Sequence, residues 1–184
     1  MNRTHRLATR RLVLRRPRAS DLAALHAIMS EARAMRYWAT PAHGTMEETR
    51  AWLARTVAAA RSGRSDEFII ERRGQVIGKA GAWRMPEIGF ILGLPFWGHG
   101  YAHEAMCAVI GDLFARHPTD QLTADVDPRN AASQKLLGRL GFQETGRAKN
   151  TILWGDEWCD SAYYALDRKV WQARTPPPER LSGK

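Results

Sequence analysis

Gly98, Gly100 and Ala102 stand two residues apart, where a short apolar run meets a long segment with helical apolar spacing. That order predicts a strand, a loop of small residues and then a helix. Small residues let an anion approach the backbone, and the first N–H groups of a helix carry a partial positive charge. The junction therefore predicts a site for a phosphate-bearing ligand. On these residues alone, an ordinary glycine turn at a helix start is the alternative.

The elements around this loop predict a mixed α/β (α+β) domain. The expected strands are residues 12–14, 68–70, 76–78, 87–92, 122–126, 144–149 and 161–166. The expected helices are residues 22–29, 46–62, 102–113 and 130–140. An antiparallel meander followed by a strand–helix–strand crossover places the strand near Val126 parallel to the strand near Ile91. Ligands favour the carboxyl ends of such strands, where the glycine loop lies.

Local signals support this order of elements. Ser20-Asp21 is expected to cap the first helix, and Thr45 with Glu48 has capping-box spacing before the second. A Rossmann dinucleotide loop fits poorly, because its strand should come first in the fold, whereas here a meander precedes the loop.

Length and composition bound the class of protein. The 184 residues predict one domain over residues 1–170, with a flexible tail over the Pro- and Ser-containing residues 171–184. No apolar run approaches the roughly 20 residues that span a bilayer, and no signal peptide is evident, so we expect no membrane partner and a cytoplasmic location. Cys107 and Cys159 are expected to be reduced thiols.

The net charge of +9 comes from arginines scattered along the chain. No aromatic-basic RNA motif or zinc-finger spacing accompanies them, so a solvated basic surface is expected and a nucleic-acid partner is not. His99 and His103 lack a third ligand, and no metal site is predicted. The oligomeric state stays open between a monomer and a homodimer.

Two motifs carry a family resemblance. Residues 89–105, Gly-Phe-Ile-Leu-Gly-Leu-Pro-Phe-Trp-Gly-His-Gly-Tyr-Ala-His-Glu-Ala, resemble the acetyl-CoA-binding motif of the GNAT superfamily of N-acetyltransferases. Residues 130–142 are similar to the N-x-x-S-(x)7-G-F signature of the branch with the ribosomal-protein N-terminal (alanine/serine) acetyltransferases. The opening from Thr9 and the segment 154–164 also fit, so the resemblance spans residues 9–168.

The resemblance implies a mostly antiparallel central sheet with a splayed parallel strand pair and helices on both faces. It also implies that the splayed strand and the loop amides bind acetyl-CoA and that Asn130 hydrogen-bonds the cofactor arm. Trp97 takes a loop position where many members have Gln or Arg, which removes one side-chain contact. The residues thus assigned to the cofactor are Phe90, Ile91, Leu92, Trp97, Gly98, His99, Gly100, Tyr101, Ala102, Asn130 and Ser133.

Two candidate catalytic residues follow from the resemblance and the chemistry of acyl transfer. Many superfamily members place a Tyr acid where this chain has Leu137, so Ser133 is the candidate that protonates the leaving thiolate. With a reference pKa of roughly 8.5, the thiolate is also a fair leaving group without an acid. Glu87, beside the expected splay, is the candidate base for the incoming amine. A surface Ser and a strand-end surface Glu are the alternatives.

The acceptor is expected to contact aromatic and acidic residues far from the loop in sequence. Core packing is the alternative for the aromatic residues, and simple solvation for the acids. The candidates are Tyr37, Trp38, Trp83, Trp154, Asp156, Glu157 and Asp160.

The resemblance implies direct transfer of an acetyl group from acetyl-CoA to a primary amine, with CoA as product. The preferred acceptor is the N-terminal α-amine of a protein or peptide. A small amine (an antibiotic, a polyamine or a toxic peptide) is the alternative acceptor. The alternative to an enzyme is a CoA-binding or nucleic-acid-associated module without catalytic activity.

Overall fold

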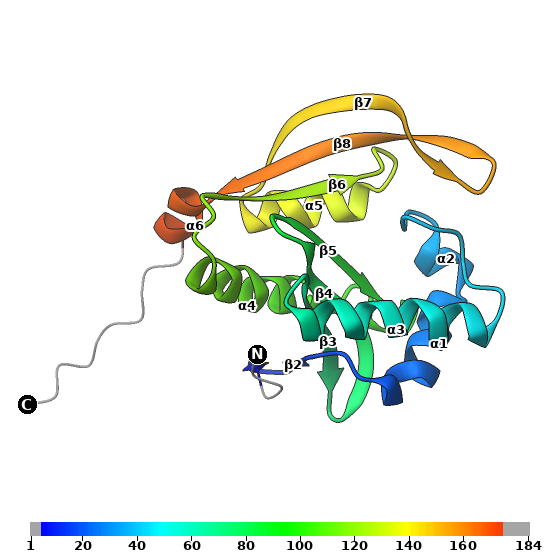
Figure 1. The fold of residues 1–184 in the computed structure, drawn as a ribbon. Helices are drawn as coiled ribbons and strands as arrows, with labels where there is room; N and C mark the ends of the chain where they lie inside the picture. Colours follow the sequence, from blue (N-terminus) through cyan, green and yellow to red (C-terminus); the bar gives the residue numbers. More distant parts are fainter. Residues whose placement is uncertain (1–4, 175–184) are drawn as a thin grey trace, which may run out of the picture.

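A computed structural model describes residues 5–174 as one eight-stranded sheet with helices packed against it (Figure 1). The strands are β1 (Arg6–Ala8), β2 (Val13–Arg15), β3 (Asp66–Arg72), β4 (Gln75–Arg84), β5 (Glu87–Leu92), β6 (Gln121–Val126), β7 (Gln143–Trp154) and β8 (Glu157–Asp167). The α-helices are α1 (Leu22–Met29), α2 (Ala32–Met35), α3 (Met46–Ser62), α4 (Tyr101–Arg116), α5 (Ala131–Leu140) and α6 (Arg168–Arg174). Short 3₁₀ turns cover Ala19–Asp21 and Leu94–Phe96.

The strands lie in the order β1-β2-β3-β4-β5-β6-β8-β7, and every neighbouring pair is antiparallel except β5 and β6. The parallel pair has a single register position, Glu87 opposite Thr123. Beyond it the two strands separate, while β4 and β8 stay paired to their outer edges. The meander, the crossover through α4 and the splayed pair are therefore confirmed.

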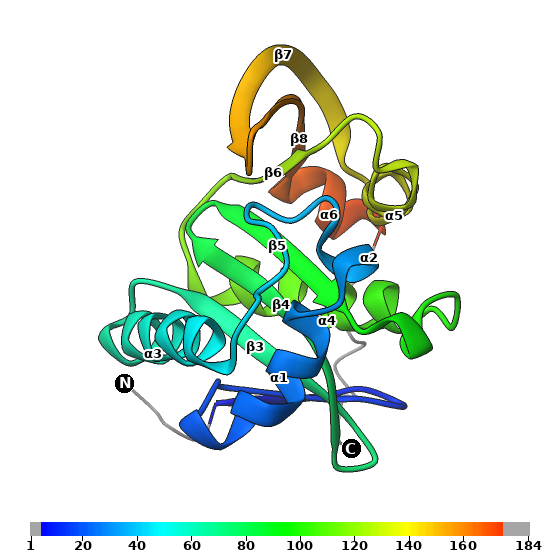
Figure 2. The ribbon, with the colours of Figure 1, turned by 90° about the vertical axis from the view of Figure 1, so that its right-hand side faces the viewer.

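Both faces of the sheet carry a hydrophobic core, because successive side chains of a strand point to opposite faces. Phe68 and Ile70 belong to the main cluster together with α4, whereas Ile69 between them packs with Leu25 of α1 and Leu53 of α3. Figure 2 shows α1 and α3 on one side of the central strands and α4 on the other. The prediction of helices on both faces is confirmed.

Several elements differ from the sequence expectation. Strand β1 was not predicted, and β7 is longer than the predicted 144–149. Both lie at sheet edges and have only exposed and half-buried residues, so neither the short β1 nor the second half of β7 shows an apolar run in the sequence. The short helix α2 was not expected. Residues 171–174 of the expected tail are helical, because Trp171 packs into the main core, and residues 175–184 lie outside the described residues. Within residues 5–174, no helix combines the length and apolar composition of a membrane crossing.

The two predicted helix caps have different outcomes. The Thr45 side chain accepts from the Glu48 N–H at 3.2 Å, which confirms the cap of α3. Asp21 is the N-cap residue of α1, as predicted, but its side chain makes no capping hydrogen bond to that helix and instead accepts from Arg15 at 2.6 Å and from the Arg18 N–H at 2.9 Å. Asp21 is buried, and its charge is used to anchor β2.

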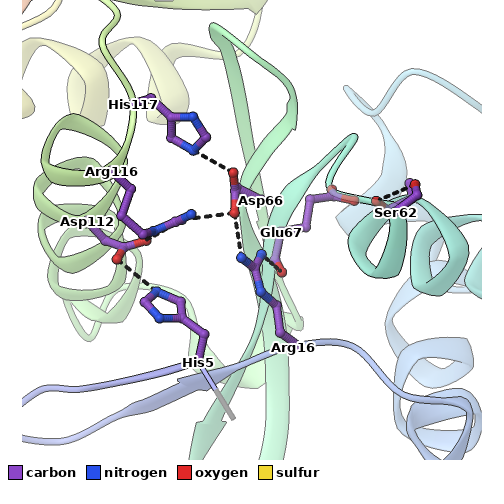
Figure 3. Close-up of polar contacts among 9 residues, drawn as sticks. His5, Arg16, Ser62, Asp66, Glu67, Asp112, Arg116 and His117 are labelled. Carbon is purple, nitrogen blue, oxygen red and sulfur yellow. Dashed lines mark hydrogen bonds and ion pairs between the residues drawn. The ribbon is translucent and has the colours of Figure 1, made fainter. Parts of the chain in front are cut away.

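A buried ionic cluster joins the N-terminal strands, β3 and the end of α4 (Figure 3). The Asp66 carboxylate, 2% exposed, accepts hydrogen bonds from Arg16 at 2.5 Å and Arg116 at 2.9 Å, and contacts His117 at 2.7 Å. Arg116 also donates to Asp112. Burial alone would raise the pKa of Asp66, but the hydrogen bonds from Arg16 and Arg116 outweigh it and lower the pKa. The cluster fixes the position of α4 against the sheet.

We predict that Asp66→Asn lowers the free energy of unfolding by about 2 kcal/mol at pH 7, because two half-buried guanidinium groups lose their shared anion. The folded-state pKa is lowered, so the carboxylate stabilises the fold above the unfolded-state pKa of about 3.9. That contribution is lost as pH falls through the folded-state pKa. Urea unfolding of both proteins at pH 7 and near pH 2 measures it. An equal difference at both pH values would contradict the prediction.

Candidate active site

An open cleft of about 1040 Å³ lies at the divergence of β5 and β6. Its walls come from elements far apart in the sequence: the segment around α2, α3, the glycine loop with the start of α4, α5, and the β7–β8 hairpin. Figure 1 shows the turn of this hairpin above α2, and a Cβ on Gly155 in that turn would lie 3.8 Å from Pro41 Cγ. The cleft therefore runs from the glycine loop, through the splay, to the α1–α3 face.

The glycine loop presents unused backbone donors to this cleft. Gly98 and Gly100 both have φ of +76°, a left-handed conformation that glycine adopts without strain. Gly100 is the N-cap of α4 and has no side chain, whereas α3 and α5 are capped by Thr45 and Asn130. The first N–H groups of α4 are thus left without a capping side chain. The loop can hold an anion in the way the sequence predicted.

Side chains beneath the loop hold it in place. The Trp97 indole N–H donates to the Leu92 carbonyl at 2.7 Å, which ties the loop to the end of β5. His99 does not line the cleft; its ring stacks on Tyr101 with centroids 5.6 Å apart. Glu104 accepts from Thr9 at 2.6 Å and from the Arg11 side chain at 2.6 Å. Burial raises the pKa of Glu104, but these hydrogen bonds outweigh it and lower the pKa, so Glu104 is a structural anion.

The start of α5 lines the cleft across from the loop. The Asn130 side-chain oxygen accepts from the Ser133 N–H at 3.1 Å, so its NH₂ group is left as a donor toward the cleft. Ser133 lines the cleft as well. Leu137, one turn further, is fully buried in the main core, so no side chain at that position reaches the cleft. The position where many family members have a Tyr acid is thus occupied here by a core leucine.

Strand β5 presents its two faces to different halves of the cleft. Phe90 and Leu92 belong with the main core on the α4 face, and Ile91 packs with α1 and α2 on the other. Glu87 and Gly89 share the α1–α3 face with Ile91, by the two-residue period of a strand. A Cβ on Gly89 would meet nothing within 4 Å, so the cleft floor beside Glu87 is open backbone. Glu87 thus stands at the point of divergence with its side chain 31% exposed.

A second carboxylate stands across the splay, which the sequence analysis missed. Asp125 of β6 lines the cleft, and partial desolvation raises the pKa of its carboxyl. Its neighbours Ala124 and Val126 pack in the main core, so Asp125 lies on the same face as Glu87. The sequence did contain a sign of it, because Asp125 is the polar residue between Ala124 and Val126 in a strand with alternating apolar residues. It lies two residues after Thr123, the residue opposite Glu87.

The predicted acceptor residues divide into two groups. Tyr37, Trp38, Trp83, Trp154 and Asp160 all line the cleft. The Trp154 indole nitrogen is shielded from solvent and has no hydrogen-bond partner among the described residues. Asp156 and Glu157 do not line the cleft, and Glu157 instead pairs with Arg129 at 2.5 Å.

A buried ion pair on the cleft wall was also missed. Lys79 of β4 and Glu67 of β3 are bonded to each other, with side chains 5% and 8% exposed. The Lys79 ammonium lies 5.2 Å from the ring centre of Trp38 and 4.9 Å from that of Trp52. Sequence alone could not pair the two. In the β3–β4 register Lys79 lies opposite Ile69, and Glu67 lies opposite Gly81, so the ion pair is diagonal between the strands.

We predict that Lys79→Met destabilises the fold by about 3 kcal/mol, because Glu67 is left as a buried charge without a partner. The double variant Lys79→Met, Glu67→Leu should recover most of that loss, since it removes both charges and keeps the volume. Urea unfolding of the three proteins tests this. A double variant as unstable as Lys79→Met would contradict an electrostatic origin.

Comparisons with known proteins agree with this geometry. The sequence matches the acetyltransferase (GNAT) domain over residues 11–143. It is 31% identical over 85 residues to YnaD, an uncharacterized N-acetyltransferase of Bacillus subtilis, covering 46% of this chain and 50% of YnaD. It is 31% identical over 91 residues to the [ribosomal protein uS5]-alanine N-acetyltransferase of Escherichia coli, covering 50% and 47%. The chain thus spans about half the length of these two relatives.

The fold is similar to that of RimL, a ribosomal L7/L12 alpha-N-protein acetyltransferase solved in complex with coenzyme A. The TM-score is 0.78 at 20% identity, over 89% of this chain and 98% of RimL. The domain match covers most of the described residues, including the splayed strands, the glycine loop and the start of α5. The chain therefore belongs to the GNAT family of acetyltransferases.

Proposed function

We propose that this protein transfers an acetyl group from acetyl-CoA to the N-terminal α-amine of a peptide or protein. The observation that carries the proposal is the splay of β5 and β6, which joins an anion-binding loop on one face to two carboxylates on the other. The family membership supports the reaction, and the uS5-alanine relative supports the α-amine as acceptor.

The residues present fit the donor. CoA carries a pyrophosphate, and the uncapped N-terminus of α4 with Gly98 and Gly100 offers backbone N–H groups to an anion. The separated edge of β5 offers backbone groups to the amide-bearing arm, and the Asn130 NH₂ group can bond it on the way to the splay. The bound donor supplies a thioester carbonyl, which is already activated toward an amine.

The acceptor amine must be neutral when it attacks. An α-amine has a reference pKa of about 7.7–8.0, so an appreciable fraction is neutral near pH 7. Glu87 lies at the splay on the acceptor face, where its carboxylate can take the amine proton directly or through one water. Asp125 and Asp160 line the same cleft and favour the ammonium form on arrival.

The thiolate that leaves, with a reference pKa of roughly 8.5, is a fair leaving group that a hydrogen-bond donor would stabilise further. Ser133 lines the cleft at the start of α5, and its hydroxyl is the side chain we assign to this role. Its backbone N–H is held by Asn130 at 3.1 Å, which fixes the residue at the first turn of the helix.

We predict that Gly98→Ala raises the Kd for CoA about tenfold, because a left-handed alanine strains the loop that carries the backbone donors. Gly74 is the matched control. It has φ of +79° in the β3–β4 turn, and a Cβ there would also meet nothing within 4 Å. Both substitutions should lower stability by about 1 kcal/mol. Calorimetric titration with CoA that finds equal Kd values for the two variants would place CoA elsewhere.

The transfer itself is tested by thiol release from acetyl-CoA with a peptide panel. We expect release with peptides that have a free N-terminal Ala or Ser, and none with the same peptides after N-terminal blocking, even when they contain lysine. Release with small amines or polyamines alone would assign the small-molecule acceptor instead. Intact CoA binding without release for any amine would leave the protein a non-catalytic module.

The control for the chemistry is Glu87→Gln, which should lower kcat about 10²-fold, because an amide cannot accept the amine proton. Glu47→Gln, an exposed carboxylate on α3, makes the same change away from the cleft and should leave kcat unaltered. Equal turnover of the two variants from pH 6 to 9 would remove Glu87 as the base.

A further inference from the structure

The cleft wall formed by α3 and the segment around α2 carries three arginines that the reaction does not use. Arg33 of α2, Arg36 directly after it and Arg55 of α3 are exposed and line the cleft. Among residues 5–174, no carboxylate lies within 4.0 Å of any of the three guanidinium groups. Elsewhere in the fold, Arg11, Arg15, Arg16 and Arg116 are bonded to acids, whereas exposed arginines such as Arg61 and Arg64 also have no acid within 4.0 Å among the described residues but do not line the cleft.

The remaining charges of the cleft give it a polarity. The carboxylates of Glu87, Asp125 and Asp160 lie on strands β5, β6 and β8, around the splay. The positive charge of Lys79 is already bonded to Glu67, and that of Arg129 to Asp127 at 2.6 Å. Arg139 of α5 also lines the cleft without an acid within 4.0 Å among the described residues. The cations of the cleft that lack partners in the described part of the chain thus stand on or next to helices, and these acids stand on strands, where Glu87 also has Arg84 at 4.0 Å.

The field of Arg36 reaches the end of β6. Arg36 is one of the charges that lower the pKa of Asp127, although burial raises it and Arg129 contributes more. Arg33 and Arg36 are spaced three apart, which places them on one side of the α2 segment. Guanidinium groups bind carboxylates through two parallel hydrogen bonds. A ligand that binds this wall therefore carries anionic groups.

We infer that the acceptor is a peptide whose free α-amine is followed by acidic side chains. The α-ammonium would approach the acids at the splay, and the carboxylates of the following residues would meet Arg33, Arg36 and Arg55. The Trp154 indole N–H, which has no partner among residues 5–174, lies in the cleft wall as a donor for a peptide carbonyl. This inference rests on the proposed function and specifies its acceptor, because a polyamine or a basic N-terminus would face repulsion at the arginines.

The test compares three peptides that share an N-terminal Ser and differ at the next four positions, which are all Asp/Glu, all Asn/Gln or all Lys. We expect kcat/KM about tenfold higher for the acidic peptide than for the amide peptide at low salt, because exposed pairs contribute up to about fivefold each. The advantage should shrink at 0.5 M salt, where exposed charges are screened. The lysine peptide should be the poorest of the three.

The triple variant Arg33→Ala, Arg36→Ala, Arg55→Ala should bring the ratio of acidic to amide peptide close to one. Arg61→Ala is the matched control, since Arg61 is exposed on α3 and does not line the cleft. It should keep the ratio of the parent protein. Circular dichroism melting of each variant shows that the comparison is made on folded protein.

The outcomes separate this inference from the proposed function. Equal kcat/KM for all three peptides, with turnover intact, would overturn the acidic acceptor and leave α-amine acetylation standing. Absence of turnover with every peptide would overturn the proposed function itself. Salt-sensitive binding of a short RNA that needs the same three arginines, without a preference among peptides, would assign the wall to phosphates and overturn the inference.

Discussion

The single register position between β5 and β6 is the constraint on which the rest of the site depends. Two parallel strands in a buried sheet normally stay paired, because an unpaired backbone group away from water costs free energy. Here β4 and β8 hold the outer edges, and the α4 crossover fixes the ends, so the inner edges open beyond Glu87 and Thr123. The opening leaves backbone donors and acceptors for a ligand and connects the two faces of the sheet.

The charge of the chain serves the fold as much as the cleft. Asp66, Glu104 and Asp21 are anions held by Arg16, Arg11 and Arg15, which anchor β2 and the residues beside it to β3, to α4 and to the turn before α1. A net charge of +9 therefore does not by itself indicate a polyanionic partner. What distinguishes Arg33, Arg36 and Arg55 is that they line the α2–α3 wall of the cleft without such an acid among the described residues, and it is this position that gives a functional interpretation to a small part of a basic composition.

The glycine loop, where we place the donor, could be predicted from the sequence, and the acceptor side of the cleft only in part. Backbone N–H groups bind an anion whatever the side chains are, so two glycines and a helix start were enough to locate the loop. The pairing of Lys79 with Glu67 and the approach of Asp125 to the splay depend on strand register, which a single sequence does not specify. Asp156 and Glu157 were expected in the cleft because acids would attract the positive charge of the amine, but neither lines it, and Glu157 pairs with Arg129.

The difference between a loop built from backbone and an acceptor side built from side chains explains how the two ligands can be bound on opposite faces of the sheet. On the α4 face the contacts we propose for the donor come from backbone at a loop with two left-handed glycines, so little there would depend on side-chain identity. On the α1–α3 face the floor is the open backbone of Gly89, and selectivity must come from side chains carried by helices and by the β7–β8 hairpin. Acids on the strands attract any amine. The helices that carry Arg33, Arg36 and Arg55 are therefore the elements able to distinguish one amine from another.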